Sequence, residues 1–191
     1  MARVSSDKKS LKKKPTTARR KNELIFIVGG ARSGKSDLAL KLSRSLKPKA
    51  FIATAEPLDQ EMTIRIRKHQ RSRRGAWDTV EVPVEMSQWF RTKGKGYQSI
   101  VVDCLTLWLS NIVGDSKLRK KFPKFLKEFL KAVRMVPGRV IVISNEVGLG
   151  IVPADPETRQ FRDLAGRMNQ QVASAADEVY FVASGLPLRL K

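Results

Sequence analysis

The sequence predicts an α/β fold in which a mostly parallel sheet carries helices on both faces. Short strand-like runs alternate along the chain with segments whose apolar residues have helical spacing. A glycine-rich stretch joins the first of these runs to the first helical segment, as in many strand-to-helix turns. The 191 residues are 41% hydrophobic, which is enough for one domain with a core of its own.

The expected strands are short runs of apolar and β-branched residues. They occupy 24–28, 50–53, 79–82, 99–102, 140–143 and 179–183, and a last edge strand is expected at 186–190. The run Leu24–Val28 ends in Gly29 and Gly30, and Asp103 directly follows the run Ser99–Val102. Both strands are therefore expected to end in small or polar residues that a ligand can approach.

The expected helices are amphipathic. They cover 37–46, 58–72, 118–135 and 157–175. In the third, Leu118, Phe122, Phe125, Phe129 and Val133 share one side, and most of the other side is basic. Because strands and helices alternate, parallel pairing through crossover helices is favoured.

The charge is strongly positive and unevenly distributed. The formal net charge of +20 indicates an anionic partner, which can be nucleic acid, a membrane surface or nucleotide phosphate. Residues 1–21 carry nine Lys or Arg against one acid, Asp7, and few apolar residues. We interpret 1–21 as a disordered basic tail and 22–191 as one catalytic domain. An organelle-targeting role for the tail is less favoured because it lacks an apolar helix face.

Cysteine usage and hydropathy exclude several classes of protein. Cys104 is the single cysteine, which excludes a disulfide framework and a cysteine-based metal cluster and fits a reducing cytoplasm. No run of 18 apolar residues is present, so no membrane span is expected.

The strongest chemical motif lies at the first strand-to-helix turn. It comprises Gly29, Gly30, Ala31, Arg32, Ser33, Gly34, Lys35 and Ser36, and it fits the P-loop pattern G-x-x-x-x-G-K-[ST]. Such a loop turns backbone N–H groups toward phosphate oxygens at a helix N-terminus. Lys35 is expected to contact the β- and γ-phosphates, and Ser36 is expected to bind Mg²⁺. Asp103 is expected as a second metal ligand, the alternative being a turn-forming aspartate.

A basic run contains the chain's only histidine, His69. Six of the ten residues in 65–74 are Lys or Arg. On a helix, His69 shares a face with Met62 and Ile66, and Arg65 and Arg73 flank it. Nearby cations favour the neutral, nucleophilic imidazole. A histidine that only packs or forms hydrogen bonds remains the alternative.

Four stretches then resemble a known family. They are VGGARSGKS (28–36), FIATAEPLDQEM (51–62), RIRKHQRSRRGAWDTVE (65–81) and NEVGLGIVPADPETRQFRDLAGRMNQQVASAADEVYFVASG (145–185). From about Leu24 to Lys191 the chain resembles the bifunctional adenosylcobinamide kinase / adenosylcobinamide-phosphate guanylyltransferase of cobalamin biosynthesis. The resemblance implies a P-loop, RecA-like sheet with one antiparallel strand, usually assembled as a trimer.

The resemblance also implies an activity. The family phosphorylates the aminopropanol hydroxyl of adenosylcobinamide with ATP or GTP. It then transfers GMP from GTP to the new phosphate, through a GMP–histidine intermediate that corresponds here to His69. The implied nucleotide contacts, besides Gly29 to Ser36, are Ala55, Glu56, Pro57, Gln70, Arg71, Ser72, Arg73, Glu81 and Asp103.

Two other function classes stay open on the residues alone. A different P-loop small-molecule kinase would use the same loop, with His69 in a structural role. A nucleic-acid-binding NTPase would explain the charge of +20. The sequence contains no aromatic stacking platform and no recognisable nucleic-acid module, so no nucleic-acid partner is expected.

Overall fold

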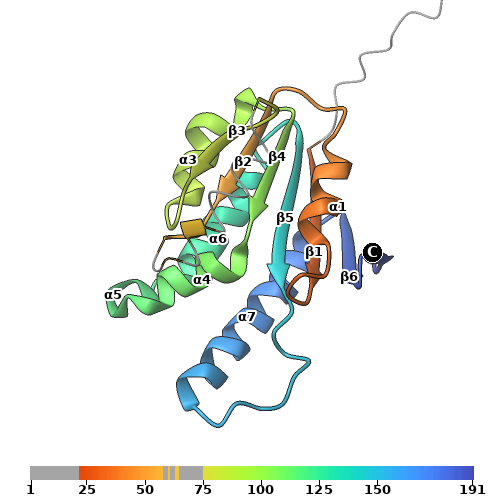
Figure 1. Ribbon diagram of the computed structural model, residues 1–191. Helices are drawn as coiled ribbons and strands as arrows, with labels where there is room; N and C mark the ends of the chain where they lie inside the picture. The colour runs from red at the N-terminus through yellow and green to blue at the C-terminus, as the bar shows by residue number, and fades with distance from the viewer. Residues whose placement is uncertain (1–21, 58–59, 61–62, 65–74) are drawn as a thin grey trace, which may run out of the picture.

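The computed structural model describes residues 22–57, 60, 63–64 and 75–191. Figure 1 shows a twisted central sheet with helices packed on both faces. Among the described residues the strand order is β3-β2-β4-β5-β1-β6-β7, and only the β6–β7 pair is antiparallel. The predicted α/β fold, mostly parallel with one antiparallel strand, is confirmed.

All seven strands lie where the sequence predicts them, with ends that shift by a few residues at most. They are β1 (Glu23–Gly29), β2 (Lys49–Ala53), β3 (Asp78–Glu81), β4 (Ser99–Asp103), β5 (Arg139–Asn145), β6 (Glu178–Ala183) and β7 (Leu186–Arg189). Each of the first six runs had enough β-branched or aromatic residues to be recognised without its neighbours.

The helices are predicted less completely. They are α1 (Lys35–Leu42), α3 (Met86–Lys93), the short 3₁₀ turn η1 (Gly94–Gly96), α4 (Leu105–Gly114), α5 (Ser116–Arg119), α6 (Phe122–Val133) and α7 (Pro156–Ala175). The expected helix at 157–175 is confirmed as α7, and the one at 37–46 corresponds to the shorter α1. Most of the helix expected at 58–72 lies outside the described residues.

One expectation about the helices was wrong, and two helices were not predicted. The helix expected at 118–135 is divided into α5 and α6, because the Asp115 side chain caps α5 and Pro123 lies in the first turn of α6. Helices α3 and α4 were not predicted. Helix α4 reads LTLWLSNIVG, and such a short apolar run has no periodicity that separates a buried helix from a buried strand.

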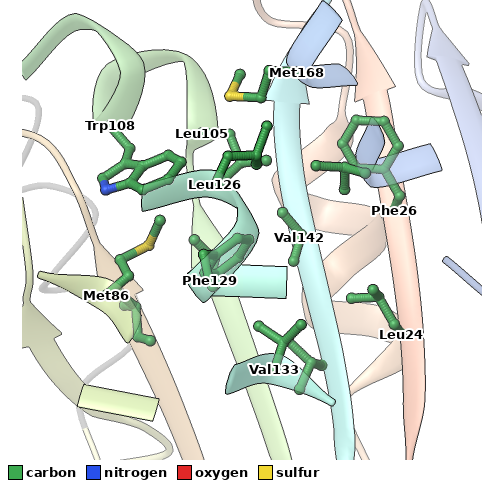
Figure 2. Close-up of a cluster of buried hydrophobic side chains, with 14 of the residues drawn as sticks. Leu24, Phe26, Met86, Leu105, Trp108, Leu126, Phe129, Val133, Val142 and Met168 are labelled. Atoms are coloured by element: carbon green, nitrogen blue, oxygen red, sulfur yellow. The ribbon is translucent and has the colours of Figure 1, made fainter. Parts of the chain in front are cut away.

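Two apolar clusters hold the layers together, one on each face of the sheet. The larger cluster joins the sheet to α3, α4, α6 and α7, and Figure 2 shows part of it around Trp108, Phe129, Val142 and Met168. The smaller cluster joins the sheet to α1 through Ala39. Side chains alternate between the two clusters along each strand, so a residue's place in a strand decides which face it occupies.

The parallel strands all end at one edge of the sheet (Figure 1). In the register, Gly29 of β1 pairs with Asn145 of β5, and Asp103 of β4 pairs with both Ile143 of β5 and Ala53 of β2. Ligands of open α/β sheets bind outside the carboxyl ends of the strands. Within the described residues, no helix is long and apolar enough to cross a membrane.

Candidate active site

The P-loop connects β1 to α1 at this carboxyl edge. Arg32 and Gly34 both have positive φ, of 54° and 97°, which curls the backbone between them. Gly34 is the N-cap residue of α1, and no side chain caps the helix there. Backbone N–H groups that turn inward at a helix N-terminus form a concave site for an anion.

The β6–β7 hairpin packs against the P-loop. Ser184 and Gly185 form the two-residue turn between β6 and β7, both with positive φ, as a type I′ turn requires. The Gly185 N–H donates to the Ser33 carbonyl at 2.9 Å. A Cβ on Gly29 would lie 2.2 Å from the Val182 carbonyl oxygen. The loop therefore rests on the backbone of β6, and no side chain fits at residue 29.

This contact gives a matched pair of variants. Gly29→Ala forces a methyl group against backbone, and it is expected to lower the free energy of unfolding by about 1–3 kcal/mol. A Cβ on Gly30 meets no atom of the described residues within 4 Å. Gly30→Ala is expected to change stability by less than about 1 kcal/mol. Denaturant unfolding of both variants measures the difference, and equal stability would contradict the close approach of β6.

The structure brings Lys35, Ser36 and Asp103 together. Lys35 is 7% exposed, and its Nζ donates to the Gly30 carbonyl at 2.5 Å across the loop. The Ser36 hydroxyl donates to Asp103 Oδ2 at 2.8 Å. Asp103 comes from β4, and β5 lies between that strand and β1. The two predicted metal ligands, 67 residues apart in the chain, are thus direct neighbours.

One polar atom of the loop is buried without a partner. The Ser33 hydroxyl forms no hydrogen bond within the part of the chain that the structure describes. A buried hydroxyl without a partner is unfavourable by about 1–3 kcal/mol. A phosphate oxygen held by this loop is an acceptor of the kind that Ser33 lacks, so the orphaned hydroxyl agrees with an anion site.

Thr54 fixes the segment that follows β2. It is fully buried, and its hydroxyl donates to the Cys104 carbonyl at 2.7 Å and accepts the Cys104 N–H at 2.9 Å. The Asn111 side chain of α4 donates to the Thr54 carbonyl at 2.8 Å. The residues after Thr54, Ala55 to Pro57, become progressively exposed at the carboxyl edge. They are therefore anchored to the same strand end that carries Asp103.

Glu81 lies at the far end of the edge. It is exposed at the end of β3, and β3 is four strands away from β1. At the usual strand spacing this is roughly 19 Å from the P-loop strand. Glu81 pairs with Ala53, which in turn pairs with Asp103, so Glu81 lies two strands, or roughly 10 Å, from Asp103. One nucleotide contacts both Glu81 and Lys35 only if it extends along the edge.

Cys104 follows Asp103 directly, but its thiol is not reactive near neutral pH. Burial, and to a smaller extent the negative charge of Asp103, raise the pKa of the Cys104 thiol to about 11. The thiol is therefore protonated near pH 7, and it is neither a nucleophile nor a metal ligand there.

The stretch 65–81, which begins with the basic run, is described only from residue 75 onward. His69, Gln70, Arg71, Ser72 and Arg73 lie outside the described residues. Trp77 is described, and its ring meets Phe51 edge-on with centroids 6.0 Å apart. The Lys49 ammonium lies 4.6 Å from the Trp77 ring centroid. The tryptophan of this stretch therefore packs against the amino-terminal half of β2.

Sequence reasoning missed several residues of this edge. The side chains of four residues hold the strand ends through hydrogen bonds to backbone groups, and one of these strand ends is the backbone of Asn145; the four are Thr54, Thr106, Asn111 and Asn169. Thr54 had a signal that went unused, because it directly follows the predicted strand 50–53, as Asp103 follows 99–102. Asn145 stands two residues beyond the predicted strand 140–143, within the longer observed β5. The helix residues gave no such signal, since their partners are distant in sequence.

Comparison with known proteins identifies relatives that match nearly all of the chain after the basic tail. The model of the family "Cobinamide kinase / cobinamide phosphate guanyltransferase" matches residues 25–190. The bifunctional adenosylcobalamin biosynthesis protein CobP of Pseudomonas aeruginosa is 40% identical over 168 residues, covering 87% of this chain and 96% of that protein. The bifunctional adenosylcobalamin biosynthesis protein CobU of Escherichia coli is 33% identical over 180 residues, covering 88% and 99%.

Solved structures are more distant. A KaiC-like protein from Pyrococcus horikoshii is 12% identical with a TM-score of 0.47, covering 84% of this chain and 71% of that one. A RadB recombinase is 16% identical with a TM-score of 0.49, covering 85% and 74%. The family assignment depends on the sequence matches, which span nearly all of the described residues and the whole P-loop. The chain belongs to the cobinamide kinase / cobinamide phosphate guanyltransferase family.

Proposed function

We propose that this chain phosphorylates adenosylcobinamide, with ATP or GTP as donor, and then transfers GMP from GTP to the product. The second step yields adenosylcobinamide-GDP and pyrophosphate. The observation that carries the proposal is the meeting of Lys35, Ser36 and Asp103 at a P-loop, inside a family match over 25–190. Few arrangements other than nucleotide phosphate chemistry use these three groups together.

The kinase step uses the P-loop. The backbone between Gly29 and Lys35 holds the phosphates, and the Lys35 ammonium contacts the β- and γ-phosphates. The Ser36 hydroxyl and the Asp103 carboxylate are hard oxygen donors 2.8 Å apart, a combination that suits Mg²⁺. Bound Mg²⁺ would neutralise charge on the phosphates. The substrate hydroxyl then forms the new O–P bond and loses its proton to solvent, as the bond between the γ-phosphorus and the β-phosphate oxygen breaks.

The guanylyl step uses His69 as nucleophile. A neutral imidazole nitrogen attacks the α-phosphorus of GTP, the N–P bond forms, and the bond to pyrophosphate breaks. A phosphate oxygen of adenosylcobinamide-phosphate then attacks the same phosphorus and releases the imidazole. Pro57 lies just after β2 at the carboxyl edge of the sheet, and His69 follows it by twelve residues. A fully extended chain of that length spans up to roughly 40 Å. The proposed nucleophile is therefore within reach of the site.

The nucleoside is proposed to lie along the edge from the P-loop toward β2. Ala55, Glu56 and Pro57 stand there, three strands from β1 and roughly 14 Å away. Gln70, Arg71, Ser72 and Arg73 are proposed to complete the nucleotide contacts together with Glu81. We further propose a cytoplasmic enzyme that works as a trimer, in line with the family resemblance.

A two-stage assay tests the proposal. Purified protein is incubated with adenosylcobinamide, ATP and Mg²⁺, and GTP is added afterwards. Mass spectrometry is expected to show adenosylcobinamide-phosphate in the first stage and adenosylcobinamide-GDP with pyrophosphate in the second. A phosphorylated product that never accepts GMP would reduce the proposal to a kinase. Absence of phosphorylation in both stages would refute it.

The basic tail is expected to be dispensable for chemistry. It precedes β1 and contributes few apolar residues. Deletion of 1–21 is therefore expected to leave both reactions within about threefold, or roughly 0.7 kcal/mol of barrier. Steady-state rates of the truncated and full-length proteins at physiological salt measure the effect. A tenfold or greater loss would show that the tail takes part in the reaction.

A further inference from the structure

A polar residue at the centre of the site has no role in the proposed mechanism so far. Strand β5 ends at Asn145, and β5 lies between the strand of the P-loop and the strand of Asp103. Asn145 pairs with Gly29, and it stands two residues beyond Ile143, the partner of Asp103. It therefore occupies the strand end between the loop that holds phosphates and the predicted metal ligand.

The pleat of β5 decides which way Asn145 faces. Ile141 and Ile143 belong to the apolar cluster on the α1 face. Ser144 is buried on the opposite face, where its hydroxyl lies 3.3 Å from that of Thr106 in α4. By alternation, Asn145 returns to the α1 face, the face of Ser36 and Asp103. Its amide group thus faces the space in front of the P-loop.

The backbone of Asn145 is held on both sides. Its N–H donates to the Thr106 hydroxyl at 2.8 Å, and its carbonyl accepts from the Asn169 side chain at 3.2 Å. The next N–H, of Glu146, donates to the Gly29 carbonyl at 3.0 Å and links this strand end to the P-loop. Two helices and the loop therefore fix the position of Asn145. Such pre-organisation is what a group needs to act on a transition state.

Glu146 is a weaker candidate for the same space. Its carboxylate accepts the Gly148 N–H at 2.7 Å and closes the turn that follows β5. Glu146 lies outside β5, in this turn, and its carboxylate is already engaged there. A carboxylate would also repel the anionic γ-phosphoryl group, whereas the amide of Asn145 is neutral and offers two N–H donors.

We propose that Asn145 is a catalytic residue of the kinase step, donating a hydrogen bond from its side-chain amide to the transferred γ-phosphoryl group. During transfer, charge is spread over the three equatorial oxygens of that group. Lys35 would contact the phosphates from the loop, Ser36 and Asp103 would hold a metal ion that neutralises their charge, and Asn145 would donate to the γ-phosphoryl group from the end of β5. The inference rests on the proposed use of the P-loop for phosphoryl transfer.

The two reactions should depend on Asn145 to different degrees. Phosphorylation breaks the bond between the γ-phosphorus and the β-phosphate oxygen. Formation of the GMP adduct breaks the bond at the α-phosphorus, and the γ-phosphate leaves unchanged as part of pyrophosphate. A donor placed on the γ-phosphoryl group therefore stabilises the first transition state more than the second.

Kinetics of Asn145→Ala and of the isosteric Asn145→Asp test the proposal. Both are expected to lower kcat for adenosylcobinamide phosphorylation about 100-fold, with KM for ATP changed by less than threefold. GMP adduct formation from α-labelled GTP is expected to stay within about tenfold of wild type. Gln98→Ala, which removes an exposed amide at the amino end of β4, is the control and should match wild type.

Two results would overturn the assignment. One is phosphorylation by Asn145→Ala within threefold of wild type. The other is an equal loss of both reactions with a raised KM for ATP, which would indicate a structural role. Thermal melting identifies a variant that fails to fold, and Asn145→Asp then decides because it preserves the shape of the side chain. If Lys35→Ala also keeps its phosphorylation rate, the P-loop proposal itself fails; if only the Asn145 variants keep theirs, this inference alone fails.

Discussion

His69→Ala is expected to abolish guanylyl transfer while phosphorylation of adenosylcobinamide persists. The two steps separate at this residue because they need different nucleophiles. Phosphorylation needs only the substrate hydroxyl, whereas the proposed transfer of GMP needs a protein nitrogen on the α-phosphorus. The variant should therefore form no GMP adduct and no adenosylcobinamide-GDP. Its kinase rate falls only to the extent that His69 helps to hold the nucleotide.

The site of the GMP adduct can be assigned without ambiguity in this chain. His69 is its only histidine, so a protein prepared without a histidine tag has one possible site for a GMP–histidine bond. Incubation with α-labelled GTP and Mg²⁺, followed by peptide mapping, locates the label. The adduct should be a phosphoramidate, lost in acid and stable in alkali, because protonation makes the ring nitrogen a good leaving group. Label on another residue, or label retained in His69→Ala, would refute the assignment.

The fold could be predicted well because the strands are short, apolar and separated by recognisable turns. The P-loop identified the first strand end, and Asp103 at the end of a second buried strand was correctly expected near it. Ser36 and Asp103 lie 2.8 Å apart because parallel strands end at one edge, which is a property of the fold class and not of either residue.

What could not be predicted depends on neighbours that are distant in sequence. Helix α4 is apolar on most sides because it packs between the sheet and α6. Its sequence therefore lacks the helical periodicity of apolar residues by which a helix is recognised. Asn145 gains its position from Thr106 and Asn169, which lie on two different helices. The separation of Glu81 from the P-loop follows from a strand order that the sequence does not encode locally.

Lys35→Ala is expected to lower the rate of adenosylcobinamide phosphorylation by about 10³-fold or more, roughly 4 kcal/mol of barrier. The ammonium group is already confined, since Lys35 is 7% exposed and its Nζ reaches back across the loop to the Gly30 carbonyl. A charge held there needs little reorganisation to meet the β- and γ-phosphates. Alanine removes the charge and keeps the helical backbone of α1.

The control for this variant lies on the same helix. Lys41 is exposed in the last turn of α1, so Lys41→Ala removes an equal charge away from the loop and should keep the wild-type rate. Single-turnover phosphorylation with saturating ATP separates loss of chemistry from loss of binding, and circular dichroism confirms that both variants fold. If Lys35→Ala phosphorylates as fast as Lys41→Ala, the catalytic nucleotide does not bind at this P-loop. In that event the meeting of Ser36 with Asp103 serves the fold alone.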